Sequence, residues 1–242
     1  MDLYTDLQNR FKKIVSDSNL DKEGIFVTTS ALTPEEAIGI TSRKDYPLLN
    51  GKEVLINAEF KGAIGQAFTD APTVFRGNIQ DIINMDLSDN RNKALFIASL
   101  NAVLKYLGLI SNTVHCKNQE PELCGSEFVK NLKEKFGNVN IGLVGFQPAI
   151  LDNIRKHFSV RVLDLDDNNI GKIKYDTMVE DSREKAHDVM NWADLLLVTG
   201  STVTNGTITQ FLSLDKPVFF FGTTIAGAAY LKDLERLCFY SA

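Results

Sequence analysis

The sequence contains no apolar run that approaches the ~20 residues needed to cross a membrane. Residues 1–10 also lack the order of basic, apolar and small residues that marks a secretory signal peptide. We therefore expect a cytoplasmic protein without a membrane partner. Only three cysteines are present, and this odd number predicts reduced thiols rather than a disulfide framework.

Basic residues are in the minority. The chain has 26 Lys and Arg against 31 Asp and Glu, which gives a net charge of -5. No basic tract compensates for this excess of acid. Electrostatics therefore gives no reason to expect a nucleic acid or an anionic membrane as a partner.

Several conventional catalytic and nucleotide-binding motifs are missing. No G-x-x-x-x-G-K-[ST], H-E-x-x-H or G-x-S-x-G pattern occurs. There are three histidines, and since His157 and His187 are expected on helix surfaces, we assign no catalytic base. The stretch Gly142-Leu-Val-Gly145 departs from G-x-G-x-x-G, which argues against a standard NAD or FAD site.

What is present is the composition of a folded protein. The 242 residues are 44% apolar and 24% charged, enough for one large domain or two small ones. Apolar residues over 3–15 repeat at helical spacing, and helical periodicity returns from 78 to 109. Short antiparallel strands are predicted over 24–30, 37–41 and 54–58. We expect an α+β domain over residues 1–110.

The second half of the chain alternates strands and helices. Strands are predicted at four apolar runs, 139–144, 160–165, 195–198 and 218–221. The run 195–198 is short and uniformly apolar, which is typical of a strand buried on both faces of a parallel sheet. The alternation predicts a Rossmann-like parallel α/β domain over 127–242. The turn-rich segment 111–126 is expected to link the two domains.

Each of these four strands ends at small polar or acidic residues. Because the carboxyl ends of parallel strands lie along one edge of a sheet, we expect them to converge on one ligand crevice. The expected ligand-binding residues there are Gly145, Asp164, Thr199, Gly200, Ser201, Asn205, Gly222 and Thr223. Glycines let the backbone turn tightly and approach a ligand. The alternative is that the polar loop 199–207 caps a strand-to-helix turn without any ligand.

The first half adds further expected ligand-binding residues, namely Gly62, Gly65, Thr69, Asp70 and Asn101. The two glycines, three positions apart, predict a bulge or a close approach by a ligand or another backbone, although a plain loop would also explain them. Asn101 shares the apolar face of its helix, and a buried amide must find partners. It either ties down a neighbouring loop or points into the site.

His115, Cys116 and Cys124 form the only cluster of soft ligands in the sequence. Thiolate and imidazole suit zinc, nickel, copper or iron, so a transition metal ion is a candidate cofactor. The spacing H-C-x7-C matches no zinc finger and supplies three ligands where a closed structural site needs four. Reduced cysteines in a linker are the alternative interpretation.

Several segments resemble the uncharacterised family described as putative heavy-metal chelation. They are Gly62–Thr69, the helix carrying Asn101, Val144–Pro148 and Thr199–Thr207, the last being the most specific. The likeness extends from about residue 25 to the end. It implies a domain similar to the N-terminal domain of enolase, then a Rossmann-like domain, with a pocket between them and no demonstrated reaction. The family's usual glycine-proline segment after the last strand is replaced by Phe221–Gly227.

Three hypotheses about function follow. The first is a protein that binds a metal ion or a metal-chelating small molecule in a cleft between the domains. The second is an enzyme with a nucleotide-like cofactor such as S-adenosylmethionine, with Asp164 or Asp166 on a ribose. The third is a structural or oligomeric module whose polar loops cap helices, and a homo-oligomer is therefore left open.

Overall fold

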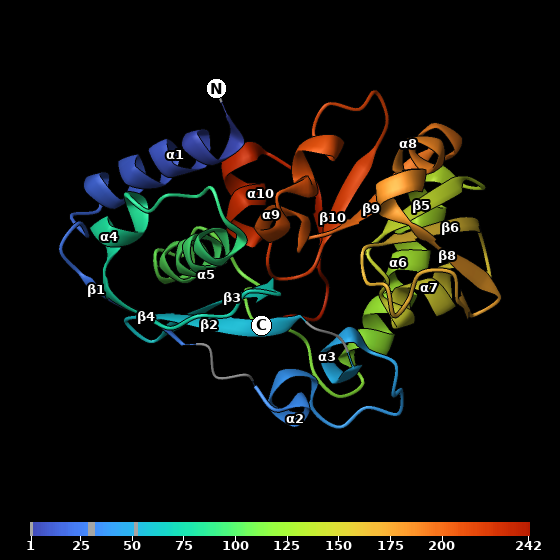
Figure 1. Ribbon diagram of the computed structural model, residues 1–242, viewed down its shortest axis with the longest axis horizontal. Coiled ribbons are helices and arrows are strands. Elements are labelled where there is room, and N and C mark those ends of the chain that lie inside the picture. The colour runs from blue at the N-terminus through green and yellow to red at the C-terminus, as the bar shows by residue number, and fades with distance from the viewer. Residues whose placement is uncertain (1, 29–31, 51–52) are drawn as a thin grey trace.

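The computed structural model describes residues 2–28, 32–50 and 53–242, and they form a mixed α/β fold with two sheets (Figure 1). The first sheet is antiparallel and has the strand order β3-β2-β1-β4. Its strands are β1 (Gly24–Thr28), β2 (Val54–Phe60), β3 (Ala63–Thr69) and β4 (Phe75–Asn78).

The second sheet is mostly parallel and has the order β11-β10-β9-β5-β6-β8-β7, where β7 alone of the described strands runs antiparallel to its neighbour. Its strands are β5 (Asn140–Val144), β6 (Ser159–Asp164), β7 (Ile173–Lys174), β8 (Thr177–Asp181), β9 (Leu195–Thr199), β10 (Val218–Phe221) and β11 (Arg236–Leu237). The apolar residues of β9 are buried between β5 and β10. This confirms the prediction of a buried parallel strand.

The helices are α1 (Leu3–Asp17), α2 (Pro34–Ile38), α3 (Pro47–Asn50), α4 (Ile79–Ile83), α5 (Asn90–Tyr106), α6 (Glu120–Phe136), α7 (Pro148–Ile154), α8 (Ser182–Trp192), α9 (Thr202–Asn205) and α10 (Ala226–Lys232), with a 3₁₀ turn at Thr207–Phe211. Helix α5 packs on β2 and β3, whereas α6 and α7 pack together against the second sheet, with α8 on its opposite face. None of the helices in the described ranges is long and apolar enough to cross a membrane.

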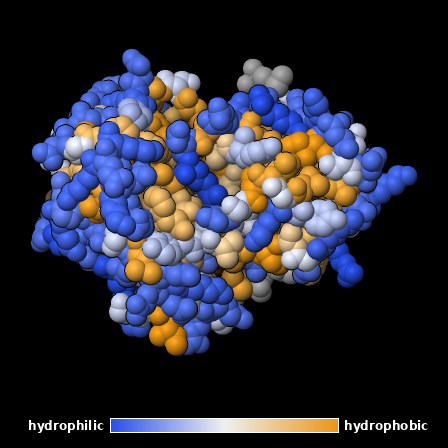
Figure 2. Space-filling view, turned by 180° about the vertical axis from the view of Figure 1, so that it is seen from behind, coloured by the Kyte–Doolittle hydropathy of each residue, from blue (hydrophilic) through white to orange (hydrophobic). Residues whose placement is uncertain are grey.

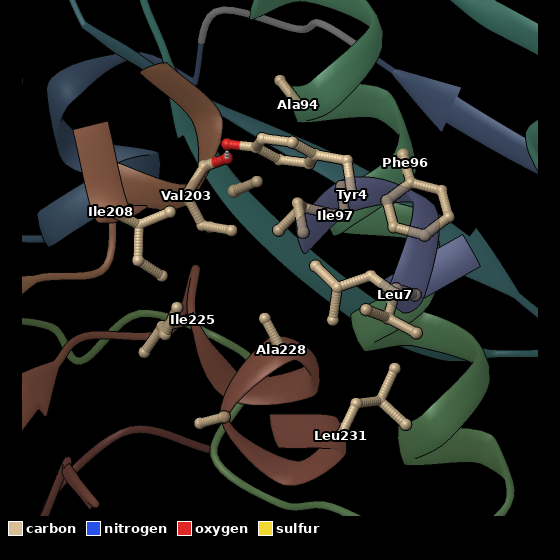
Figure 3. Close-up of a cluster of buried hydrophobic side chains, with 14 of the residues drawn as sticks. Tyr4, Leu7, Ala94, Phe96, Ile97, Val203, Ile208, Ile225, Ala228 and Leu231 are labelled. Carbon is tan, nitrogen blue, oxygen red and sulfur yellow. Dashed lines mark hydrogen bonds between the residues drawn. The ribbon is translucent and has the colours of Figure 1, made fainter. Parts of the chain in front are cut away.

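The two sheets share one hydrophobic core. Helix α1 buries an apolar stripe that includes Leu7, and it runs beside α10 (Figure 1). Figure 3 shows Leu7 and Phe96 of the first half facing Ile225 and Leu231 of the second. The Tyr4 hydroxyl donates to the carbonyl oxygen of Val203 at 2.9 Å. This core is continuous across the predicted boundary between domains 1–110 and 127–242. The division into two domains with a linker therefore stays a prediction.

Polar residues cover most of the surface seen from behind in Figure 2, and apolar residues gather mainly on the right of that view. That side carries the first sheet, since the view is turned by 180° from Figure 1.

The predicted strand over 37–41 is wrong, because α2 occupies Pro34–Ile38. Thr33 accepts a hydrogen bond from the Glu36 amide while the Glu36 carboxylate accepts one from the Thr33 amide. This capping box, with Pro34 in the first turn, outweighs the short apolar run. The strand predicted over 24–30 is present over 24–28, and residues 29 and 30 lie outside the described residues.

Three other boundaries differ from the sequence-based expectation. Helix α6 begins at Glu120, inside the segment 111–126 that was expected to be a linker. Where the alternation of strands and helices predicts a helix after the polar loop 199–207, the structure has a 3₁₀ turn at Thr207–Phe211. Strands β3, β4, β7, β8 and β11 had no counterpart in the predicted set. Strands β4, β7 and β11 are so short that their hydrophobic pattern cannot be distinguished from that of a loop.

Candidate functional site

The order in which the chain adds strands to the second sheet reverses between the parallel neighbours β5 and β9. From β5 the chain passes to β6 and β8 on one side of the sheet, and it then continues through β9, β10 and β11 on the other. In open α/β sheets, ligands bind outside the carboxyl ends of the strands at such a switch point. Gly145, with φ of +87°, and Thr199 meet there, and a Cβ on Gly145 would stand 2.6 Å from the Thr199 methyl group.

A cavity of about 530 Å³ lies at this point. It is bounded by the strand ends of the second sheet and by residues 68–70 at the end of β3 in the first. The sequence-predicted residues that line it are Thr69, Asp70, His115, Cys116, Cys124, Gly145, Asp164, Thr199, Gly200, Ser201, Asn205, Gly222 and Thr223. The four strand ends therefore converge, as the parallel topology requires.

Gly62 and Gly65 do not line the cavity. Gly62 follows Lys61 in a two-residue turn between β2 and β3, and both residues have positive φ, the conformation of a type I′ hairpin. Gly65 lies within β3 against α5, where a Cβ would stand 2.2 Å from the Ala102 nitrogen. Of the explanations for these glycines, close approach by another backbone holds for Gly65, and a tight turn holds for Gly62.

Asn101 is fully buried and also lies outside the cavity lining. Its Nδ2 donates to the carbonyl oxygens of Gln66 at 3.0 Å, Thr223 at 3.3 Å and Thr224 at 3.0 Å. Its Oδ1 accepts from the Gly227 amide at 2.7 Å. Gly227 is in the first turn of α10, whose N-cap residue makes no side-chain cap bond, so Asn101 caps that helix from α5. The amide ties down a loop rather than entering the site.

The loop after β9 uses most of its hydroxyl groups within the fold. Thr202 donates to the Thr199 carbonyl at 2.8 Å, and the Asn205 Oδ1 accepts from the Thr207 amide at 3.0 Å. The Thr204 hydroxyl contacts the carbonyl oxygens of Ser201 and Phe68 at 2.8 Å each, which joins the loop to the first sheet.

The φ of Gly200 does not lie in the left-handed region that favours glycine. Glycine is required there by crowding instead, because a Cβ would stand 2.9 Å from the Ile225 nitrogen and 3.1 Å from the Phe221 carbonyl oxygen. The close contact is therefore with the segment after β10.

The segment 32–50 forms another wall of the cavity through Ile38, Tyr46 and Leu48. Arg43 fastens this segment to the second half by pairing with Glu122 of α6 and with Asp152 of α7, the latter at 2.7 Å. The Tyr46 hydroxyl donates to the same Glu122 carboxylate at 2.8 Å.

One end of the cavity is acidic. Glu53, which the sequence analysis missed, lines it together with Asp70, Asp164 and Asp166. Burial, followed by the nearby negative charges of Asp164, Asp70 and Asp166, raises the pKa of Glu53 to about 7. No pattern around Glu53 marks it in the sequence, because its neighbours come from both sheets. The lining residues include no Lys or Arg in the described part of the chain.

Asp164 organises this end of the cavity. Its carboxylate accepts from the backbone amides of Phe146 at 3.0 Å, Leu165 at 2.6 Å and Asp166 at 2.8 Å, and from Asn169 Nδ2 at 3.3 Å. A carboxylate has about four lone-pair sites, so these four donors leave Asp164 without capacity for a ribose diol.

The other end carries thiols and an imidazole. Cys238, a further residue that the sequence analysis missed, lines the cavity with Cys116 and Cys124. Burial raises the pKa of Cys116 and raises that of Cys124 to about 11, so both thiols are protonated near neutral pH. Burial lowers the pKa of His115 to about 4, although interactions of the ring with the backbone of Cys116 and Ala37 act in the opposite direction, so the imidazole is neutral.

These soft groups do not form a ready-made metal site. Within residues 2–28, 32–50 and 53–242, no three His, Cys, Asp or Glu side chains stand in positions to hold a metal ion. The donor set suits a soft metal, since a neutral imidazole is a ligand as it stands and a thiol becomes one on losing its proton.

Comparison with known proteins finds a family that is similar to part of this chain. Residues 129–233 match the model of the family described as putative heavy-metal chelation, DUF364. The resemblance drawn from the sequence is confirmed. The matched segment runs from α6 to α10 and so includes the strand-end loops that line the cavity.

Two solved structures from this family are similar to the chain. One, a protein of unknown function from Pyrococcus horikoshii, shares 16% identity with a TM-score of 0.55, and the match covers 90% of this chain and 79% of that one. The other, from Desulfitobacterium hafniense, shares 10% identity with a TM-score of 0.50, covering 74% and 72%. At these identities the likeness concerns the fold. No protein of curated function matches the chain.

Proposed function

We propose that this protein binds a metal-chelating small molecule, with or without its metal ion, in the cavity between the two sheets. The main supporting observation is that a single cavity of about 530 Å³ is lined at one end by the soft donors His115, Cys116 and Cys124 and at the other end by polar and acidic residues. That volume suits a small organic molecule rather than a bare ion. The family description points the same way.

The geometry favours a metal complex over an ion held by protein alone. Because the described residues contain no preformed set of three ligands, the missing donor atoms must come from the bound compound. His115 can supply a neutral nitrogen and the cysteines can supply sulfur after deprotonation. The proposal includes the two-domain architecture, an enolase-N-terminal-like domain followed by a Rossmann-like domain, with the cavity between them.

The test is elemental analysis of protein purified without oxygen, in wild-type form and as the double variant Cys116→Ser/Cys124→Ser. We expect bound metal in the wild type and its loss in the double variant. His187→Gln is the matched control, because His187 is exposed on α8 and does not line the cavity. Equal metal content in all three forms would indicate that the carboxylates, and not the cysteines, bind the metal.

A thermal-shift screen completes the test. The probes are Ni²⁺ and Zn²⁺ alone and the same ions with 1,10-phenanthroline. A ligand at ~100 times its dissociation constant adds ~2.7 kcal/mol of stability, which such a screen resolves. Metal-free protein together with no shift from any of these probes would refute the proposal.

A nucleotide-like cofactor is the second candidate function. The topology supports it, because the cavity lies at the switch point where such cofactors bind. Asp166 is the ribose ligand under this proposal, since the Asp164 carboxylate is occupied. The absence of Lys and Arg from the described lining disfavours phosphate groups and favours the sulfonium cation of S-adenosylmethionine. Adding this compound to the thermal-shift screen tests the idea.

A further inference from the structure

The acidic end of the cavity has carboxylates that no basic side chain offsets. Asp167 also lines the cavity, but it is exposed and pairs with Arg183 at 2.6 Å. Glu53, Asp70 and Asp166 form no ion pair with any residue in the described part of the chain. A concave site with charge of one sign and low-dielectric walls concentrates ligands of the opposite charge. A cationic group is the complement of this end.

The opposite end contains polar atoms that lack partners. Thr223 is 1% exposed, and its hydroxyl has no hydrogen-bond partner in the described structure. The His115 Nδ1 is buried and equally unpartnered. Both residues line the cavity. Since a buried polar group without a partner costs about 1–3 kcal/mol, these atoms indicate a polar group on a bound molecule.

The distance between the two ends excludes a single small ion as the common partner. Thr223 follows β10, whereas Asp164 and Asp166 of the acidic end lie at and just after the end of β6, and β9 and β5 lie between these strands. Three strand spacings amount to about 14 Å. The cavity lining also contains large apolar side chains, among them Phe128, Phe146 and Phe221.

We infer that the ligand is an elongated amine, with its ammonium group between Glu53, Asp70 and Asp166 and a hydrogen-bonding group at Thr223 and His115. This rests on the proposed function and specifies its chelating compound as a cation with an apolar middle. The ammonium group donates to the carboxylates, and the apolar body packs on the phenylalanines.

Three probes of equal chain length test this by calorimetry in metal-free buffer at pH 8: 8-amino-1-octanol, octylamine and octanoate. The variants are Glu53→Gln/Asp166→Asn for the acidic end and Thr223→Val for the other end. Asp167→Asn is the matched control, since it removes a lining carboxylate that Arg183 already neutralises.

We expect both amines to bind the wild type at least tenfold more tightly than octanoate. The double variant should bind both amines at least tenfold more weakly than the wild type, because a charge-assisted hydrogen bond contributes about one to two powers of ten in affinity. Thr223→Val should weaken only the amino alcohol, and Asp167→Asn should change nothing. Circular dichroism of each variant confirms that it is folded.

Three results would overturn the inference: octanoate binding as tightly as the amines, no loss in the double variant, or no binding of either amine at millimolar concentration. These are distinguishable from failure of the proposed function. If the metal content is lost in the cysteine double variant but the amine affinity is unchanged in the carboxylate double variant, the proposed function stands and this inference is wrong.

Discussion

Replacing Asn101 with leucine should be among the most damaging single changes in this protein. The leucine fills a similar volume, but the Gly227 amide at the start of α10 is left buried without its acceptor, a cost of about 1–3 kcal/mol. The carbonyls of Gln66 and Thr224 lose a donor as well, whereas Thr223 retains one from the Ala226 amide. A total loss of about 3–5 kcal/mol in unfolding free energy is expected.

Urea denaturation followed by circular dichroism measures this loss as a shift in the transition midpoint. Asn92→Ala on the same helix is the matched control, because the Asn92 side chain makes one exposed hydrogen bond to the Asp86 carbonyl. That control should lose no more than about 1 kcal/mol. A loss below about 1 kcal/mol for Asn101→Leu would show that the four-bond network does not hold α10 and β3 together.

Two further changes test the packing and the acidic end. Gly65→Ala should lower the melting temperature through a loss of about 1–3 kcal/mol, since its methyl group meets α5 backbone; an unchanged melting temperature would contradict the contact. Burial, followed by the charges of Asp164, Asp70 and Asp166, raises the pKa of Glu53 from 4.5 to about 7. The folded state therefore binds this proton more tightly than the unfolded state, so the stability of the wild type falls as the pH rises from 4.5 to about 7. Because glutamine stays neutral, the unfolding free energy of Glu53→Gln should exceed that of wild type by an amount that grows to about 3 kcal/mol between pH 5 and pH 8. Parallel urea titrations measure this difference, and its absence would show that the Glu53 carboxyl titrates normally.

Local patterns predicted four adjacent strands of the second sheet. The runs 139–144, 160–165, 195–198 and 218–221 correspond to β5, β6, β9 and β10, because buried parallel strands are short, apolar and flanked by turn residues. Their shared edge then follows from topology alone, and it brought most of the predicted lining residues to one cavity.

The remaining features depend on contacts that no local pattern records. Glu53 and Cys238 reach the cavity only through packing between segments far apart in the chain. Gly65 was predicted to mark a close approach, but which backbone approaches it is set by the position of α5. By contrast, α2 was predictable from the sequence Thr33-Pro34-Glu35-Glu36, whose capping pattern was passed over in favour of the apolar residues that follow.

The core shared by the two sheets also constrains how the chain can be made. Tyr4 and Val203 are 199 positions apart, and the cavity lining extends to Ser241. Such remote contacts carry a large loop-closure cost before any packing repays it, so they form late and slowly. During synthesis, the part of the α1 surface that packs on α10 therefore stays uncovered until residues 226–232 have left the ribosome. A chaperone that covers this surface would protect the nascent protein from aggregation.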